Sequence, residues 1–189
     1  MTKTTNLAKA LFAVVAAIAV TFVVASPASA SKVGGSTLKL KHSTFEGFAD
    51  IGIDVDGTGK AKFTKNGLHI PLSSGKVDPE TGKAKFVHKG GIAFSMNGKS
   101  IAFDDLIVKV AGKKNVIKGS VGNGKTRFGD LNAKKLDIQQ KKNGKFIYSN
   151  IKVFIAKKGA KEIEKALGLS GTYDLAGVKL GKLTTKFKG

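Results

Sequence analysis

Three histidines are the imidazole ligands that this chain offers to a metal or haem iron, and the sequence contains no cysteine that could supply a thiolate. His42, His69 and His88 each fall in a different segment that we expect to be a strand. Imidazole is the commonest protein ligand for metals and a frequent one for haem iron. Two of the three could meet at one metal or haem iron, but nothing in their spacing requires it. A lone histidine on a strand is more often a surface or core residue.

One segment matches a phosphate-binding loop letter by letter. Gly119–Thr126 (GSVGNGKT) fits the pattern G-x-x-x-x-G-K-[ST]. Such a loop needs a helix directly after it, so that the helix N-terminus faces the phosphates. The residues that follow, Arg127–Asp130, do not predict a helix. We therefore interpret the segment as a glycine-rich hairpin loop.

The acidic residues do not form a catalytic or metal-binding pattern. Asp54–Gly59 (DVDGTG) begins like a calcium loop, but Lys65 occupies the twelfth position, where a bidentate glutamate is needed. A plain turn is the better interpretation. Asp104 and Asp105 are adjacent, so on a strand they would point to opposite faces, and a bulge or a switch of face explains them better than an acid/base pair. No Ser-His-Asp arrangement stands out either, so we do not expect an enzyme.

Strands are predicted to position most of these residues. Thr37–His42 alternates apolar and polar residues, which is typical of a half-buried strand. The turn Asn97–Gly98 lies between two β-rich segments, and Asn-Gly is a strong hairpin signal because both turn residues must tolerate a positive φ. Gly75–Val110 contains this turn and a break at Gly90-Gly91. We expect it to form the centre of an antiparallel meander.

A helical period is clear in one place. In Lys158–Leu169 the apolar residues fall on one face, and Gly168 suits a C-cap. Ser43–Asp50 fits either a short helix or a bulged strand. The expected fold class is therefore mainly β: a single antiparallel β-rich domain, a sandwich-like meander, with one short α-helix in the C-terminal half.

The first thirty residues predict a cleaved secretory signal. Lys3 and Lys9 form a positive start, Ala10–Ala25 is apolar, and Ala28–Ala30 supplies an A-x-A cleavage pattern. Cleavage would leave one domain, residues 31–189, and would lower the formal charge from +20 to +18 by removing two lysines. No second apolar run follows, so no membrane span is expected after cleavage. The predicted location is secreted, extracellular or cell-wall associated.

The mature chain is strongly basic, and nearly all of its positive charge is lysine, since Arg127 is the only arginine. Lysine acts as a point charge and not as a bidentate fork, so a sequence-specific nucleic-acid reader is not expected. Lysines that alternate with apolar residues favour a solvated outer face of a sheet. The alternative is a continuous cationic surface for a polyanion, such as anionic cell-wall polymers, lipid headgroups or extracellular DNA.

Most of residues 36–187 resembles the HtaA-like, haem-transport-associated domain family of secreted and surface proteins of actinobacteria. The similarity is carried by glycine and apolar patterns in Gly75–Gly82, Val87–Phe94, Leu106–Val108, Ile155–Lys161, Ala166–Gly168 and Ala176–Leu183. The resemblance implies a β-rich domain with a minor helical part that binds haem outside the cell and passes it to an uptake system.

The resemblance also implies where haem would bind. Family members ligate the iron through a tyrosine in an opening segment, supported by a histidine in a hairpin. In this chain Phe48 stands at the tyrosine position and Met96 near the histidine position. A phenyl ring cannot bind iron, and a thioether binds it weakly on its own. Either haem is bound differently, through His42 or His88, or the fold is kept without the ligand. The hypotheses are thus a non-enzymatic module for haem or another small hydrophobic ligand and, alternatively, a basic cell-envelope protein.

Overall fold

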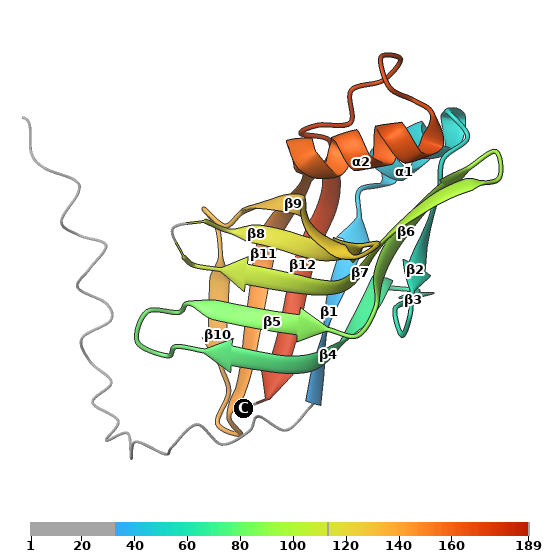
Figure 1. The fold of residues 1–189 in the computed structure, drawn as a ribbon. Helices are drawn as coiled ribbons and strands as arrows, with labels where there is room; N and C mark the ends of the chain where they lie inside the picture. Colours follow the sequence, from blue (N-terminus) through green and yellow to red (C-terminus); the bar gives the residue numbers. More distant parts are fainter. Residues whose placement is uncertain (1–32, 113, 189) are drawn as a thin grey trace, which may run out of the picture.

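The computed structural model describes residues 33–112 and 114–188, so the expected signal segment lies outside the described residues (Figure 1). The described part contains two helices, α1 (His42–Asp50) and α2 (Lys157–Leu167). Its strands are β1 (Val33–Leu40), β2 (Asp54–Thr58), β3 (Lys62–Thr64), β4 (Gly67–Val77), β5 (Ala84–His88), β6 (Gly91–Met96), β7 (Lys99–Val110), β8 (Val116–Val121), β9 (Gly124–Asn132), β10 (Asp137–Gln140), β11 (Lys145–Ile155) and β12 (Lys179–Lys188).

Eight strands form a sheet that closes into a barrel-like sandwich. Their order is β7-β5-β4-β1-β12-β11-β9-β8, and β8 pairs back onto β7. Strands β2 and β6 extend the sheet beyond β7, while β3 pairs with β4 and β10 with β11. Every pairing is antiparallel. The prediction of a mainly β, antiparallel domain is confirmed.

The central region is one long hairpin with a break in its first arm. Strands β5 and β6 lie end to end along β7, and the tip is Asn97–Gly98, whose φ angles are 50° and 75°. These positive angles suit the Asn-Gly turn, so the predicted hairpin is confirmed. The arm breaks at Gly90 and Gly91, where a Cβ on Gly91 would overlap the carbonyl oxygen of Phe103. At this break the sheet divides, because β4 lies beside β5 whereas β2 lies beside β6. Strand order therefore departs from a simple meander here.

Helix α2 is the predicted amphipathic helix. It buries Gly159, Ala160, Ile163 and Leu167, and it lies against β7 and β9. Gly168 ends it with a left-handed φ of 77°, which glycine adopts without steric cost. No helix in the described part of the chain is long and apolar enough to cross a membrane.

Helix α1 settles the ambiguous segment Ser43–Asp50 and adds a second helix to the one predicted. The prediction that His42 ends a strand is wrong, because β1 stops at Leu40 and His42 begins α1. The backbone N–H of Lys41 donates to the carbonyl of Leu180, which is the last step of the β1 ladder. Phe48 is the one residue of α1 that is buried, so no continuous stripe of buried residues runs along this helix as it does along α2.

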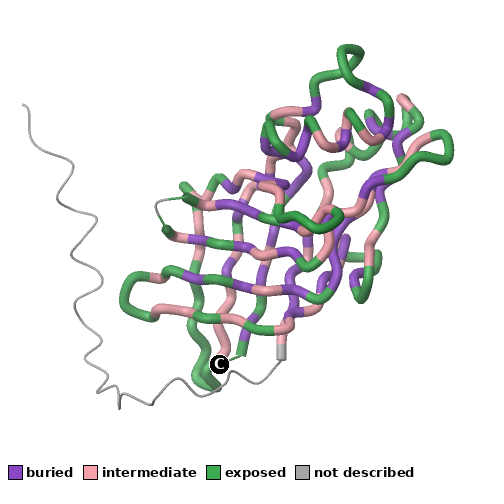
Figure 2. The backbone as a smooth tube through the Cα atoms, viewed as in Figure 1, coloured by how far each residue is buried: buried purple, intermediate pink, exposed green. Residues whose placement is uncertain are grey.

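Buried residues alternate with less buried ones along the strands of the barrel (Figure 2). Many of the largest buried side chains are aromatic. The aromatic layer nearest the helices, here called the helix-end layer, consists of Phe48, Phe94, Phe103 and Phe128. The group nearest the β4–β5 turn, here called the turn-end group, consists of Phe86, Tyr148 and Phe187. An enclosed space beside His88 measures only about 10 Å³, which is at the lower limit for one water molecule. The interior of an eight-strand barrel is just wide enough for side chains to fill it, which agrees with so small a remaining space.

Candidate ligand site at helix α1 and strand β6

Phe48 lies in the last turn of α1 and points into the core, with 5% of its surface exposed. Its ring packs edge to face on Phe94 of β6, with centroids 5.9 Å apart. The chain reverses directly after the helix, where the N–H of Ile53 donates to the Phe48 carbonyl at 2.8 Å. This reversal fixes Phe48 over β6.

Met96 lies at the end of β6, next to the hairpin tip, and is half-buried against the core. It is two residues from Phe94, so both side chains occupy the same face of the strand. Its Cγ would lie 3.8 Å from a Cβ placed on Gly52, in the reversal that follows α1. The structure thus brings Phe48 and Met96 to one apolar neighbourhood, with Phe94 as their common neighbour.

This neighbourhood does not fit haem ligated in the manner that the resemblance implies. Phe48 offers no donor atom, and the Met96 thioether is a weak ligand on its own. Three hollows can be identified around the described residues, at the β4–β5 turn, beside His88 and beside His69, and neither Phe48 nor Met96 lines any of these three. The residues form a closed apolar cluster of aromatic and thioether groups, in which Phe48 is 5% exposed and Phe94 is fully buried, so a flat hydrophobic molecule would have to enter between α1 and β6 to contact them.

His88, one of the two alternative ligands, is buried in the barrel and is fully hydrogen-bonded. Its Nδ1 lies 2.8 Å from the carbonyl oxygen of Leu106, and its Nε2 lies 2.7 Å from Oγ of Ser36. Ser36 Oγ in turn lies 2.6 Å from Oγ1 of Thr185. Burial lowers the pKa of His88 to about 4, against the opposing effect of the Leu106 carbonyl.

The direction of these hydrogen bonds follows from the carbonyl. Because a carbonyl can only accept, Nδ1 of the neutral His88 carries the proton and donates it to Leu106. Nε2 must then accept from the Ser36 hydroxyl, which leaves Thr185 to donate to Ser36. The pair resembles a serine nucleophile and its base, but the imidazole lacks an orienting carboxylate and the group is closed to solvent. Its role in this structure is to join β1, β5, β7 and β12.

The other two histidines are not buried in the core as His88 is. His42 is 87% exposed and pairs with Glu46 of the same helix at 3.0 Å. His69 is on the outer side of β4, opposite the buried Leu68 and Ile70. The structure does not bring the histidines together, and the described residues contain no cluster of three or more potential metal-binding side chains.

Two of the three remaining motifs behave as interpreted, and the third does not. Gly119–Thr126 spans the end of β8 and the start of β9, so it is a hairpin loop. Asp105 has a positive φ of 46°, and the β7–β8 register shifts between Asp104 and Ile107, which confirms the bulge. The Asp54–Gly59 segment, expected to be a turn, instead starts with strand β2, which pairs with β6.

Two features were missed from the sequence. One is the buried chain through His88, whose partners Ser36 and Thr185 are 149 residues apart. The other is a hollow between the β4–β5 turn and the β7–β8 connection. Alternating lysines marked the strands around this hollow, but which lysines lie opposite one another depends on the tertiary register.

The described fold is an antiparallel barrel-like domain with both helices near one end (Figure 1). No protein-family model and no curated protein matches the sequence. Among solved structures, the C-terminal domain of HtaA from Corynebacterium glutamicum matches with a TM-score of 0.60 and 17% identity, covering 82% of this chain and 94% of that one. A domain-swapped dimer of a histidine-to-alanine variant of that domain matches with a TM-score of 0.54 and 16% identity, covering 78% and 92%. The chain therefore has an HtaA-like fold.

Proposed function

We propose that the protein is a non-enzymatic binding module that takes a small hydrophobic ligand, haem being the candidate that the resemblance implies, beside α1 and β6. The observation that carries this proposal is the shared apolar neighbourhood of Phe48 and Met96, the positions aligned with the family's iron ligands. The HtaA-like fold supports it. With residues 1–30 as a cleaved signal, the module would act outside the cell or at the cell wall.

The ligand would be held by its apolar face and not through an iron bond, because neither Phe48 nor the alternative ligands His42 and His88 presents a free donor in an apolar site. The test compares haemin with iron-free protoporphyrin. We expect both to bind saturably and with similar affinity, and the haemin spectrum to lack tyrosine or histidine coordination. Absence of saturable binding by either porphyrin would overturn the proposal.

A substitution sharpens the test. Phe48→Tyr restores the phenol at the position where the resemblance places it, and we expect haemin affinity to rise at least about tenfold while protoporphyrin affinity stays constant, because only the iron gains a ligand. Phe45→Tyr, on the same helix and 44% exposed, is the matched control and should change neither. Equal gains for both porphyrins would show that the phenol acts by packing alone.

A second function, electrostatic attachment to anionic cell-wall polymers, is favoured by the uncompensated charge. In the described residues the ion pairs are His42 with Glu46 and Arg127 with Asp130, so no lysine takes part in one. Cosedimentation with cell-wall preparations at low and high salt tests this function. We expect retention at low salt that high salt abolishes, and a protein that stays in solution at low salt contradicts it.

A further inference from the structure

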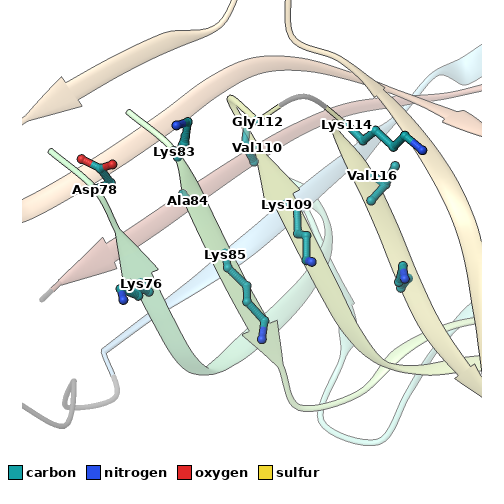
Figure 3. Close-up of a pocket in the computed structure, with 11 residues that line it drawn as sticks. Lys76, Asp78, Lys83, Ala84, Lys85, Lys109, Val110, Gly112, Lys114 and Val116 are labelled. Atoms are coloured by element: carbon teal, nitrogen blue, oxygen red, sulfur yellow. The ribbon is translucent and has the colours of Figure 1, made fainter. Parts of the chain in front are cut away.

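A hollow of about 710 Å³ lies where the β4–β5 turn meets the β7–β8 connection. Figure 3 shows side chains from β4, β5, β7 and β8 around it. Its rim carries the lysines Lys76, Lys83, Lys85, Lys109, Lys114 and Lys118. Ala84, Val110 and Val116 are buried residues that line the same hollow. We call this hollow the lysine groove.

Three of the lysines form a row that the sheet register fixes. Lys76 of β4 lies opposite Lys85 of β5, and Lys85 lies opposite Lys109 of β7. Neighbouring strands are about 4.8 Å apart, so three ammonium groups project from a width of about 10 Å. Figure 3 shows that the side chains of Lys85 and Lys109 run in the same direction. Like charges directly opposite one another destabilise a sheet, so this row lowers the stability of the strands that carry it.

The acid in the groove does not neutralise the row. Asp78 is the acidic residue of the lining. Its carboxylate accepts hydrogen bonds from the backbone N–H of Glu80 and Thr81 and from the hydroxyl of Thr81. These bonds, the Thr81 hydroxyl first, lower the pKa of Asp78, and the charge of the groove residue Lys83 lowers it further. In the described part of the chain no ion pair joins Asp78 to Lys76, Lys85 or Lys109, so these three lysines remain unpaired with acid.

The lining selects among anions. It contains no aromatic side chain on which a nucleic-acid base could stack and no arginine that could grip a phosphate with two bonds. It combines point charges, which suit repeated single anionic groups, with the apolar side chain of Val116 on the same face, which suits a short carbon segment between them. A chain of phosphates joined by small polyol units has both features.

We propose that the lysine groove binds a linear polyol-phosphate polymer, with the phosphates on Lys76, Lys85 and Lys109 and the carbon links over Val116, which lies opposite Lys109 on the same face of the sheet. The proposal rests on the electrostatic attachment described above and gives it a defined place on the molecule. Nucleic acid and anionic lipid are the competing occupants, and the test includes both.

The chain offers a matched control row on other strands. Lys39 of β1 lies opposite Lys182 of β12, and Lys182 lies opposite Lys152 of β11. This control row has the same cross-strand spacing and the same charge. None of its members lines one of the three best-formed hollows of the described residues. Removing the control row therefore shows how much polymer affinity is lost through overall charge alone, without a change to the groove.

The experiment measures fluorescence anisotropy of a labelled poly(glycerol phosphate) with the protein and two triple variants. K76Q/K85Q/K109Q is expected to bind at least about tenfold more weakly and to lower the salt slope by about 2, while K39Q/K152Q/K182Q changes affinity less than about threefold. An arginine version of the groove row, which keeps the charge, should recover most of the affinity. Circular dichroism checks that each variant is folded.

Three results would contradict the proposal that the lysine groove binds the polymer. If both triple variants weaken binding equally, affinity follows total charge, and the attachment function stands without the groove. If the wild-type protein does not bind the polymer at low salt, the attachment function itself fails. If a single-stranded oligonucleotide of equal phosphate number, or vesicles containing phosphatidylglycerol, bind more tightly than the polymer and depend on the same row, the polymer class is wrong.

Discussion

The two ends of the barrel differ in packing and in charge. At the helix end, Phe48 covers Phe94, and the aromatic layer continues through Phe103 and Phe128 with centroids 4.7 to 6.4 Å apart. The lysine groove lies at the other end, between the β4–β5 turn and the β7–β8 connection, and lysine side chains line it. In the two proposals above, the helix end would take the apolar ligand and the groove the polyanion, so the two sites would not compete.

Strand β7 connects the two ends. Its first half pairs with β6 at the helix end, and its second half pairs with β5 beside the groove. The bulge at Asp104 and Asp105 lies between the halves. A bulge bends a strand and increases its twist, so it allows one strand to serve two differently oriented parts of the sheet.

The largest effect is expected from opening the helix-end layer. Phe94→Ala removes the ring that contacts Phe48, Phe103 and Phe128, and we expect a loss of about 3–5 kcal/mol in the free energy of unfolding, from lost burial and a residual cavity. Phe45→Ala, exposed on α1, should change it by less than about 0.5 kcal/mol. Chemical denaturation measures both. A loss below about 1 kcal/mol for Phe94→Ala would mean that the layer is loosely packed.

The middle of the barrel, between the two ends, should lose stability in acid. The pKa of His88 falls from 6.5 to about 4 on folding, so the unfolded chain binds the proton more readily. The contribution of His88 to the free energy of unfolding is fully present above pH 6.5. It is lost as the pH drops from 6.5 to 4, and the total loss for this shift is about 3 kcal/mol. Denaturation midpoints at a series of pH values measure the effect.

The control for this prediction is a histidine that folding leaves in water. His88→Gln should remove most of the decline between pH 6.5 and pH 4, even though the variant starts from lower stability because Ser36 and Leu106 lose their partner. His42→Gln, at an exposed position, should leave the decline unchanged. A decline of equal size in all three proteins would assign it to the carboxylates.

The turn that borders the groove is held by a smaller interaction. The hydroxyl of Tyr148 donates to the carbonyl of Gly82 at 3.2 Å, and burial followed by the charge of Asp78 raises the Tyr148 pKa to about 12. Tyr148→Phe should cost about 1 kcal/mol at neutral pH. Because the pKa is raised on folding from 10.0, the wild type should lose stability above pH 10 and the variant less so. Thermal unfolding at pH 7 and pH 11 compares them, and Tyr173→Phe, at an exposed tyrosine, is the control.

The parts of the fold that could be predicted from the sequence are those decided by residues close together in the chain. The period of Lys158–Leu169 and the Asn97–Gly98 turn are local, and α2 and the hairpin follow from them. Helix α1 was left open because Phe48 is its one buried residue, so tertiary packing and not periodicity decides it. The apolar pairing of Phe48 with β6 came from the resemblance. The lysine groove depends on which strands become neighbours, and a single sequence does not contain that information in readable form.

The smallest effect tests whether the groove row and the control row differ in anything but their setting. Lys85 and Lys182 each stand between two lysines on adjacent strands. Replacing either by Gln removes two like-charge pairs, and we expect each variant to gain about 0.5 kcal/mol at low ionic strength and nothing at 1 M salt. Addition of the polyol-phosphate polymer should then affect the melting temperatures of the two variants differently, because a ligand stabilises the state that binds it. The melting temperature of Lys182→Gln should rise with polymer as the wild type does, whereas that of Lys85→Gln should rise less. Equal rises would show that the polymer does not distinguish a lysine row in a groove from one on an open face.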